Sequence, residues 1–116
     1  WETALHMSKA ALPALDDDDS RHLCRYYIIK SLWKLKRYEE SLKAARESIM
    51  LFPREQTFPY MYAVVALEYG KDLETAFDCA WRAIDLGTTN QGCNETFEKL
   101  REKLNKPNHP ALASRQ

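Results

Sequence analysis

Histidine is the residue type in this 116-residue sequence that most readily binds a metal or acts as a general base. The three histidines are widely separated, at His6, His22 and His109. None of them has a cysteine or a carboxylate at the spacing of a zinc site. The sequence also lacks a glycine-rich phosphate loop and a nucleophile elbow. It therefore predicts no metal site, no cofactor and no enzymatic activity.

The three cysteines offer a second kind of chemistry. Cys24 and Cys79 fall on apolar faces of predicted helices, where a thiol is buried and inert. Cys93 falls in a predicted polar turn and is the candidate reactive thiol. An odd number of cysteines at irregular spacing argues against a disulfide framework and favours a reducing compartment. We therefore predict a cytoplasmic protein, with the nucleus as the alternative.

A short basic run is the third candidate for chemistry. Its four cations surround one aromatic ring: Lys30, Trp33, Lys34, Lys36 and Arg37. Cations beside a stacking ring could contact RNA or an acidic peptide. The whole chain, however, has 17 basic and 17 acidic residues, whereas nucleic-acid and membrane-surface binders usually carry a basic excess. An ordinary solvated surface is the favoured interpretation, and RNA contact through the turn 30–37 is the alternative.

An acidic run, 16–19, precedes the second predicted helix. Its adjacent carboxylates lack the spaced ligands of a calcium loop. Asp and Ser side chains at such a place accept hydrogen bonds from the unpaired backbone N–H groups of a helix start, where negative charge is also favourable. The run therefore predicts a helix cap.

Apolar and small residues recur at steps of three and four along most of the chain, which is the period of a helix. The pattern predicts helices at about 2–15, 21–36, 38–52, 58–70, 72–86 and from 90 or 94 to 104. No apolar run reaches the length of about 20 residues that spans a membrane, so no membrane contact is predicted. The segment 105–116 has two prolines and no usable period, which predicts a mobile tail.

The predicted helices repeat. Small residues occupy equivalent places in three of them: Ala4, Ser8 and Ala11; Ser41, Ala45 and Ser48; Ala76, Ala80 and Ala83. The offset from Ser41 to Ala76 is 35 residues (76 − 41), and the offset from Ala4 to Ser41 is 37 (41 − 4). Small side chains at these places let two helices approach closely. Offsets near 34 residues in a helix–turn–helix unit are typical of one class of repeat.

On these residues the chain resembles the tetratricopeptide repeat (TPR) family over about 2–104. The matching residues are Tyr38, Ser41, Ala45, Ser48 and Pro53 in one unit, and Tyr60, Leu67, Gly70, Leu73, Ala76, Ala80 and Ala83 in the next. The departures from the family pattern are Arg25, Ile29, Val64 and Gly87–Thr88. The resemblance implies an all-α antiparallel helix–turn–helix array, the TPR-like superhelix. It would have a half unit, two full units and a terminal helix. We expect 1–104 to be this repeat domain, taken from a longer chain.

In the TPR family the first helix of each unit lines a concave binding face. The matching positions are the candidate partner-binding residues: Tyr26, Lys30, Trp33, Lys34, Phe58, Met61, Val65 and Tyr69. This set is apolar and aromatic with a few basic groups, which suits an apolar or amphipathic partner segment. Trp33 and Tyr69 lie next to turns and are expected to be the more exposed. Only Lys30 matches the carboxylate clamp of chaperone-binding members, so no chaperone clamp is predicted.

Family members mostly act as adaptors, so the resemblance implies a protein–protein interaction module within a larger assembly. The first alternative is a structural scaffold or self-associating repeat, whose rings only fill the gap between neighbouring first helices. The second is the RNA contact described above.

Overall fold

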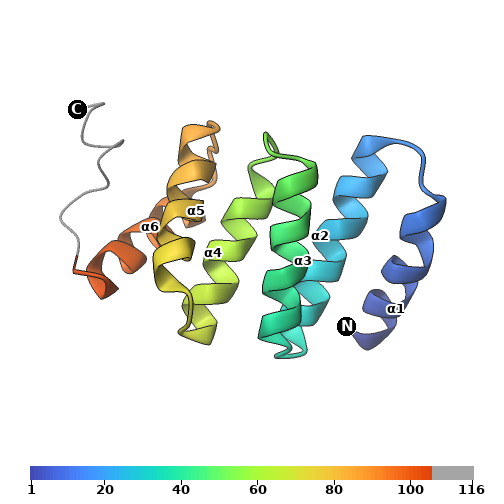
Figure 1. The fold of residues 1–116 in the computed structure, drawn as a ribbon, viewed down its shortest axis with the longest axis horizontal. Coiled ribbons are helices and arrows are strands. Elements are labelled where there is room, and N and C mark those ends of the chain that lie inside the picture. The colour runs from blue at the N-terminus through green and yellow to red at the C-terminus, as the bar shows by residue number, and fades with distance from the viewer. Residues whose placement is uncertain (106–116) are drawn as a thin grey trace.

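The computed structural model describes residues 1–105, and its helices follow one another along one axis (Figure 1). The elements are α1 (Glu2–Ala11), the 3-10 turn η1 (Leu12–Ala14), α2 (Asp18–Lys34), α3 (Tyr38–Leu51), α4 (Thr57–Tyr69), α5 (Leu73–Asp85) and α6 (Gln91–Lys103). The described residues contain no strand. Nearly all of the predicted tail, from residue 106 on, lies outside them.

Each helix packs against the next one along the chain, from α1 to α6. In addition α2 contacts α4, and α4 contacts α6, so the first helices of successive units form one row. In Figure 1 the array runs from α1 at the N-terminal end to α6 at the opposite end. The predicted all-α helical array is therefore confirmed.

Two helix boundaries differ from the prediction for identifiable reasons. The predicted helix 2–15 ends its α-helical part at Ala11 and continues as η1, because Pro13 has no N–H to donate. The second helix begins at Asp18, before the predicted residue 21, because the Asp17 side chain accepts a hydrogen bond from the Ser20 N–H at 3.0 Å. The acidic run is thus a helix cap, as the sequence predicts.

Small residues at the repeated positions let the helices approach closely. Ser41, Ala45, Ala76 and Ala80 have no exposed surface. The Ser41 hydroxyl donates a hydrogen bond to the carbonyl oxygen of Ile29 at 2.8 Å, which joins α3 to α2. A side chain of larger volume at these places would separate the helices, since close packing leaves no spare room.

The core has a large and a small part. The large cluster surrounds α4 and includes most buried aromatic rings. The small cluster, Leu5, Ile28 and Leu32, joins α1 to α2. No helix within 1–105 is long and apolar enough to cross a membrane.

Candidate partner-binding groove

One groove lies where α2, α4 and the α5–α6 turn meet; we call it the first-helix groove. Its lining residues are Tyr26, Lys30, Trp33, Gln56, Thr57, Tyr60, Met61, Val64, Thr88, Thr89 and Asn90. Four of the eight candidate residues from the sequence are among them. The sequence did not indicate Gln56 and the α5–α6 turn, because they lie outside the first helices and carry no repeat signal.

The groove combines rings with polar groups. The Lys30 ammonium lies 5.5 Å from the centre of the Tyr26 ring and 5.6 Å from that of Trp1, close enough for cation–π attraction. Burial raises the pKa of Tyr60, so its hydroxyl stays neutral and can donate a hydrogen bond. A partner segment with an apolar side chain flanked by polar groups fits such a lining.

Among the residues around this groove, Gln56 has a side-chain oxygen that lacks a hydrogen-bond donor. Its Oε1 atom is buried and accepts no hydrogen bond from any residue that the structure describes. A buried acceptor without a donor costs free energy, on the order of 1–3 kcal/mol. Because this atom is buried, a bound partner cannot reach it in this structure.

Trp33 is held by a contact between units. Its indole N–H donates to Oε2 of Glu68 at 2.7 Å, and the Tyr38 hydroxyl donates to the same oxygen at 3.0 Å. Lys36 lies 3.8 Å from that oxygen. Burial opposes ionisation of Glu68, but the hydrogen bonds from Tyr38 and Trp33 outweigh it and lower the pKa of this carboxyl group. Glu68 therefore joins α2 and α3 to α4.

Tyr69 makes a second contact of this kind. Its hydroxyl donates to Oε1 of Glu39 at 2.9 Å, and its ring stacks on the Tyr38 ring with 5.0 Å between the centres. The Lys71 ammonium lies 4.9 Å from the Tyr69 ring. The half-buried Trp33 and Tyr69, which the sequence placed as the more exposed rings, both connect the two repeat units.

Three candidates from α4 belong to the core. Phe58 and Val65 have no exposed surface, and Met61 is buried but for the part that reaches the groove. Phe58 lies against His22 of α2 and against Phe52 after α3. In this structure Phe58 and Val65 cannot touch a partner, which is the internal packing that the sequence left open as an alternative.

The basic run is largely paired. Lys34, which is exposed, lies 4.3 Å from the centre of the Trp33 ring. Lys36 lies near Glu68, as described above. Arg37 donates to Glu40 at 2.8 Å and lies 3.8 Å from Glu2. The carboxylates beside Lys36 and Arg37 reduce the positive field that an RNA contact would use, whereas the neutral ring beside Lys34 leaves its charge in place.

Cys93 is a correction to the sequence analysis. It lies inside α6, not in a polar turn, and it is fully buried. Its thiol lies 3.7 Å from the carbonyl oxygen of Ala80, and burial raises the pKa of Cys93 to about 11. A thiol in this state is almost wholly protonated near neutral pH and is not reactive. The described residues also contain no cluster of His, Cys, Asp or Glu that could hold a metal.

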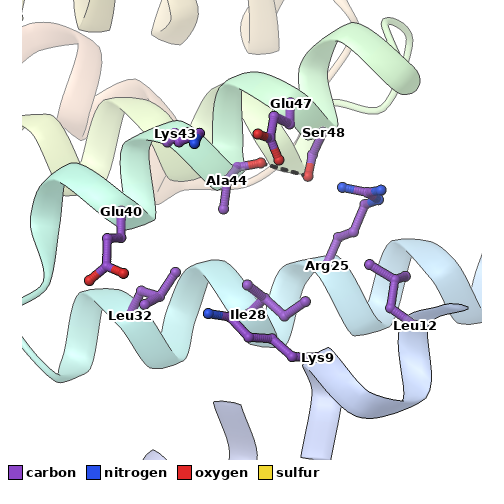
Figure 2. Close-up of a pocket in the computed structure, with 10 residues that line it drawn as sticks. All are labelled: Lys9, Leu12, Arg25, Ile28, Leu32, Glu40, Lys43, Ala44, Glu47 and Ser48. Carbon is purple, nitrogen blue, oxygen red and sulfur yellow. Dashed lines mark hydrogen bonds between the residues drawn. The ribbon is translucent and has the colours of Figure 1, made fainter. Parts of the chain in front are cut away.

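A second groove lies between α1 and α3, above α2 (Figure 2). Its floor is apolar, from Leu12, Ile28, Leu32 and Ala44, and its rim carries charges of both signs: Lys9, Arg25, Glu40, Lys43 and Glu47. The one hydrogen bond drawn among these residues joins the Ser48 hydroxyl to the carbonyl oxygen of Ala44, at 2.9 Å. Because this rim carries both positive and negative side chains, it does not favour a ligand of either charge.

Comparisons with protein-family models, with curated proteins and with solved structures find no match to this chain.

Proposed function

We propose that this protein is a protein–protein interaction module that holds an apolar or amphipathic segment of a partner in the first-helix groove. The observation that carries the proposal is the convergence of Tyr26, Lys30, Trp33 and Met61 on one groove. These residues come from two different units, and all four are among the lining positions that the resemblance to TPR proteins implies. Large rings of this kind commonly dominate binding energy at protein interfaces.

The resemblance to TPR proteins supports the same proposal. In that family helical arrays act as adaptors, and membership of this chain in the family is part of what we propose. A cytoplasmic location is proposed on the same basis, with the cysteine pattern as its other support.

The proposed binding mode follows from the lining. An apolar side chain of the partner rests on Met61 and Val64, against the Tyr26 ring. The exposed Thr89 stands at the rim and limits the width of the segment that can enter.

The test is a selection of binding peptides from a random library, followed by calorimetry on variants. Thr89→Arg fills the groove mouth, and the Thr89 side chain lies outside the core clusters. We expect this variant to weaken binding at least about tenfold, which equals about 1.4 kcal/mol. Lys43→Glu, in the other groove, is the matched control and should leave binding unchanged.

Circular dichroism of each variant checks that the helices are intact. If the selected peptides bind the Thr89→Arg protein as tightly as the unmodified one, the first-helix groove is not the binding site.

A further inference from the structure

A second hollow adjoins the first-helix groove on the side where α2 begins; we call it the acidic pocket. Its lining residues are Asp19, His22, Leu23, Tyr26, Glu55, Thr57 and Phe58. Tyr26 and Thr57 also line the first-helix groove, so the two hollows share a wall. A partner segment that extends beyond the groove on this side therefore enters the acidic pocket.

The two hollows differ in charge. The acidic pocket has the carboxylates of Asp19 and Glu55, and no lysine or arginine is among its lining residues in the described structure. The first-helix groove is the reverse, because its lining within residues 1–105 includes Lys30 but no aspartate or glutamate. The charge of the lining therefore changes from positive to negative between two adjoining hollows.

The carboxylate of Glu55 is held in place by its neighbours. Its Oε1 atom accepts a hydrogen bond from the Thr57 hydroxyl at 2.9 Å and another from the Thr57 backbone N–H at 3.3 Å. Its Oε2 atom lies 3.5 Å from Nδ1 of His22. The Thr57 groups carry no charge, so they position the carboxylate without neutralising it. The Glu55 side chain is 30% exposed, which leaves it within reach of a ligand whose binding then needs little ordering of the site.

Apolar surface lies beside the two carboxylates. Leu23 is 55% exposed, and the half-buried Tyr26 forms the wall shared with the groove. Long basic side chains lay their methylene groups along such a surface and keep the charged end in a polar site. A guanidinium group can also lie over an aromatic ring and donate two hydrogen bonds to one carboxylate. The lining of the acidic pocket therefore suits arginine, and lysine less well.

The opposite side of the first-helix groove has a different charge pattern. Thr89 lines the groove and also a hollow on α6, whose charged lining residues are Glu95, Glu98 and Lys99. Arg101 donates to Glu98 at 2.9 Å. Because cations stand among the carboxylates on this side, a basic side chain of a partner gains more at the acidic pocket.

We propose that the partner segment carries a basic side chain, preferably arginine, which enters the acidic pocket while an apolar side chain of the same segment lies in the first-helix groove. This inference rests on the proposed function and names the chemistry of its partner. The two partner side chains are two residues apart if the segment is extended, and three or four apart if it is helical. Lys30 repels a basic group from the groove, so the basic residue marks the end of the segment that lies toward the start of α2.

The first test selects peptides from a random library against the unmodified protein and, in parallel, against the double variant Asp19→Asn with Glu55→Gln. Both changes remove a charge and keep the shape of the side chain, and the amide oxygen at position 55 can still accept the hydrogen bonds from Thr57. We expect arginine or lysine to be enriched at one position of the peptides selected on the unmodified protein only. Equal frequencies of basic residues in the two pools would overturn the proposal.

Calorimetry on one selected peptide measures the contact itself. Glutamine in place of its basic residue should weaken binding to the unmodified protein at least about fivefold, because charge-assisted hydrogen bonds are lost. The same change in the peptide should leave binding to the double variant unaltered, since that protein has lost both carboxylates. Glu95→Gln, on the other side of the groove, is the matched control and should not change the affinity. An equal effect of the peptide change on the unmodified protein and the double variant would place the basic residue elsewhere and overturn the proposal.

The proposed function and this inference can fail separately. Thr89→Arg tests whether the peptides lie in the first-helix groove, whereas Asp19→Asn with Glu55→Gln leaves the lining of that groove unchanged. Peptides that bind in the groove without a basic residue would support the function and overturn this inference. A library that yields no binding peptide would overturn both.

The chain itself has basic side chains that could compete for the acidic pocket, at Lys106 and Arg115. The full chain with Lys106→Glu and Arg115→Glu is therefore measured with the same peptide. We expect the affinity to stay the same. Tighter binding by this variant would make residues 106–116 the occupant of the pocket and would overturn a separate partner.

Discussion

The two ends of the array are built differently. At the C-terminal end, α6 buries Phe97 and Leu100 against the core and turns exposed residues such as Glu98 and Lys99 to the outside. At the N-terminal end, α1 buries only Leu5 and leaves apolar side chains exposed. A helical array needs a terminal helix with a polar outer face, because stacking otherwise leaves apolar surface in water. Within 1–105, α6 meets this requirement and α1 does not.

The largest expected effect on stability is at the C-terminal end, where α6 covers the core. Phe97→Ala removes a ring that stacks on Phe77 with 4.8 Å between the centres. We expect a loss of about 3–5 kcal/mol in the free energy of unfolding, because the ring is 2% exposed and its removal leaves a cavity. Urea denaturation measures this loss. Lys99→Ala, on the exposed face of α6, is the control and should change stability by less than about 0.5 kcal/mol.

A smaller effect on stability is expected at the N-terminal end, in α1. Leu5→Ala removes the only buried side chain of α1, and we expect a loss of about 2 kcal/mol, at the low end for a core leucine, since α1 can move to fill the space. Hydrogen exchange should show the loss mainly in the amides of α1, with α4 unchanged. Equal loss of protection in α4 would mean that both ends unfold together with the core. The two ends would then not differ in local stability.

The smallest effect on stability is expected for Glu68, which lies between the two ends of the array. Its pKa is lowered in the folded protein from the usual 4.5, so its ionised form stabilises the fold above pH 4.5. This contribution is lost as the pH falls through the lowered folded pKa. Because the Glu68 side chain is 44% exposed and solvent screens its charge, we expect it to contribute less than about 1 kcal/mol.

The measurement compares the unmodified protein with Glu68→Gln, which cannot ionise, by thermal melting between pH 3 and pH 7. The difference in melting temperature should be present at pH 7 and should shrink toward pH 3. A difference that does not depend on pH would show that the hydrogen bonds to this side chain need no charge.

The helices could be predicted because their causes are local. The step of three and four residues, the cap at Asp17 and the left-handed Gly70 after α4 all act within a few residues of the chain. Pro13 lies near the end of the predicted helix 2–15, but its effect begins earlier, at Ala11, because the missing N–H breaks the α-helical bonding pattern there.

The candidate site could be predicted only in part. Periodicity places Phe58 and Val65 on a helix face, but burial of that face depends on how closely α2 approaches α4, which no local pattern encodes. Cys93 stands just before residue 94, the later of the two predicted helix starts, so the sequence places it in a polar turn. In the structure Gly92 lies close to Tyr60: a Cβ atom on Gly92 would lie 2.6 Å from the Tyr60 hydroxyl, so a larger residue there would displace the Tyr60 side chain. This contact joins segments far apart in the sequence.

The hydrogen bond from Trp33 to Glu68 also bears on the width of the first-helix groove. The two residues are 35 positions apart, so they are equivalent in successive units, and their bond holds neighbouring first helices at one fixed separation. Residues of α2 and α4 line the first-helix groove, so the separation of these two helices sets its width. A change at this one carboxylate, by protonation or by substitution, should therefore alter the shape that the groove presents to a ligand several residues away.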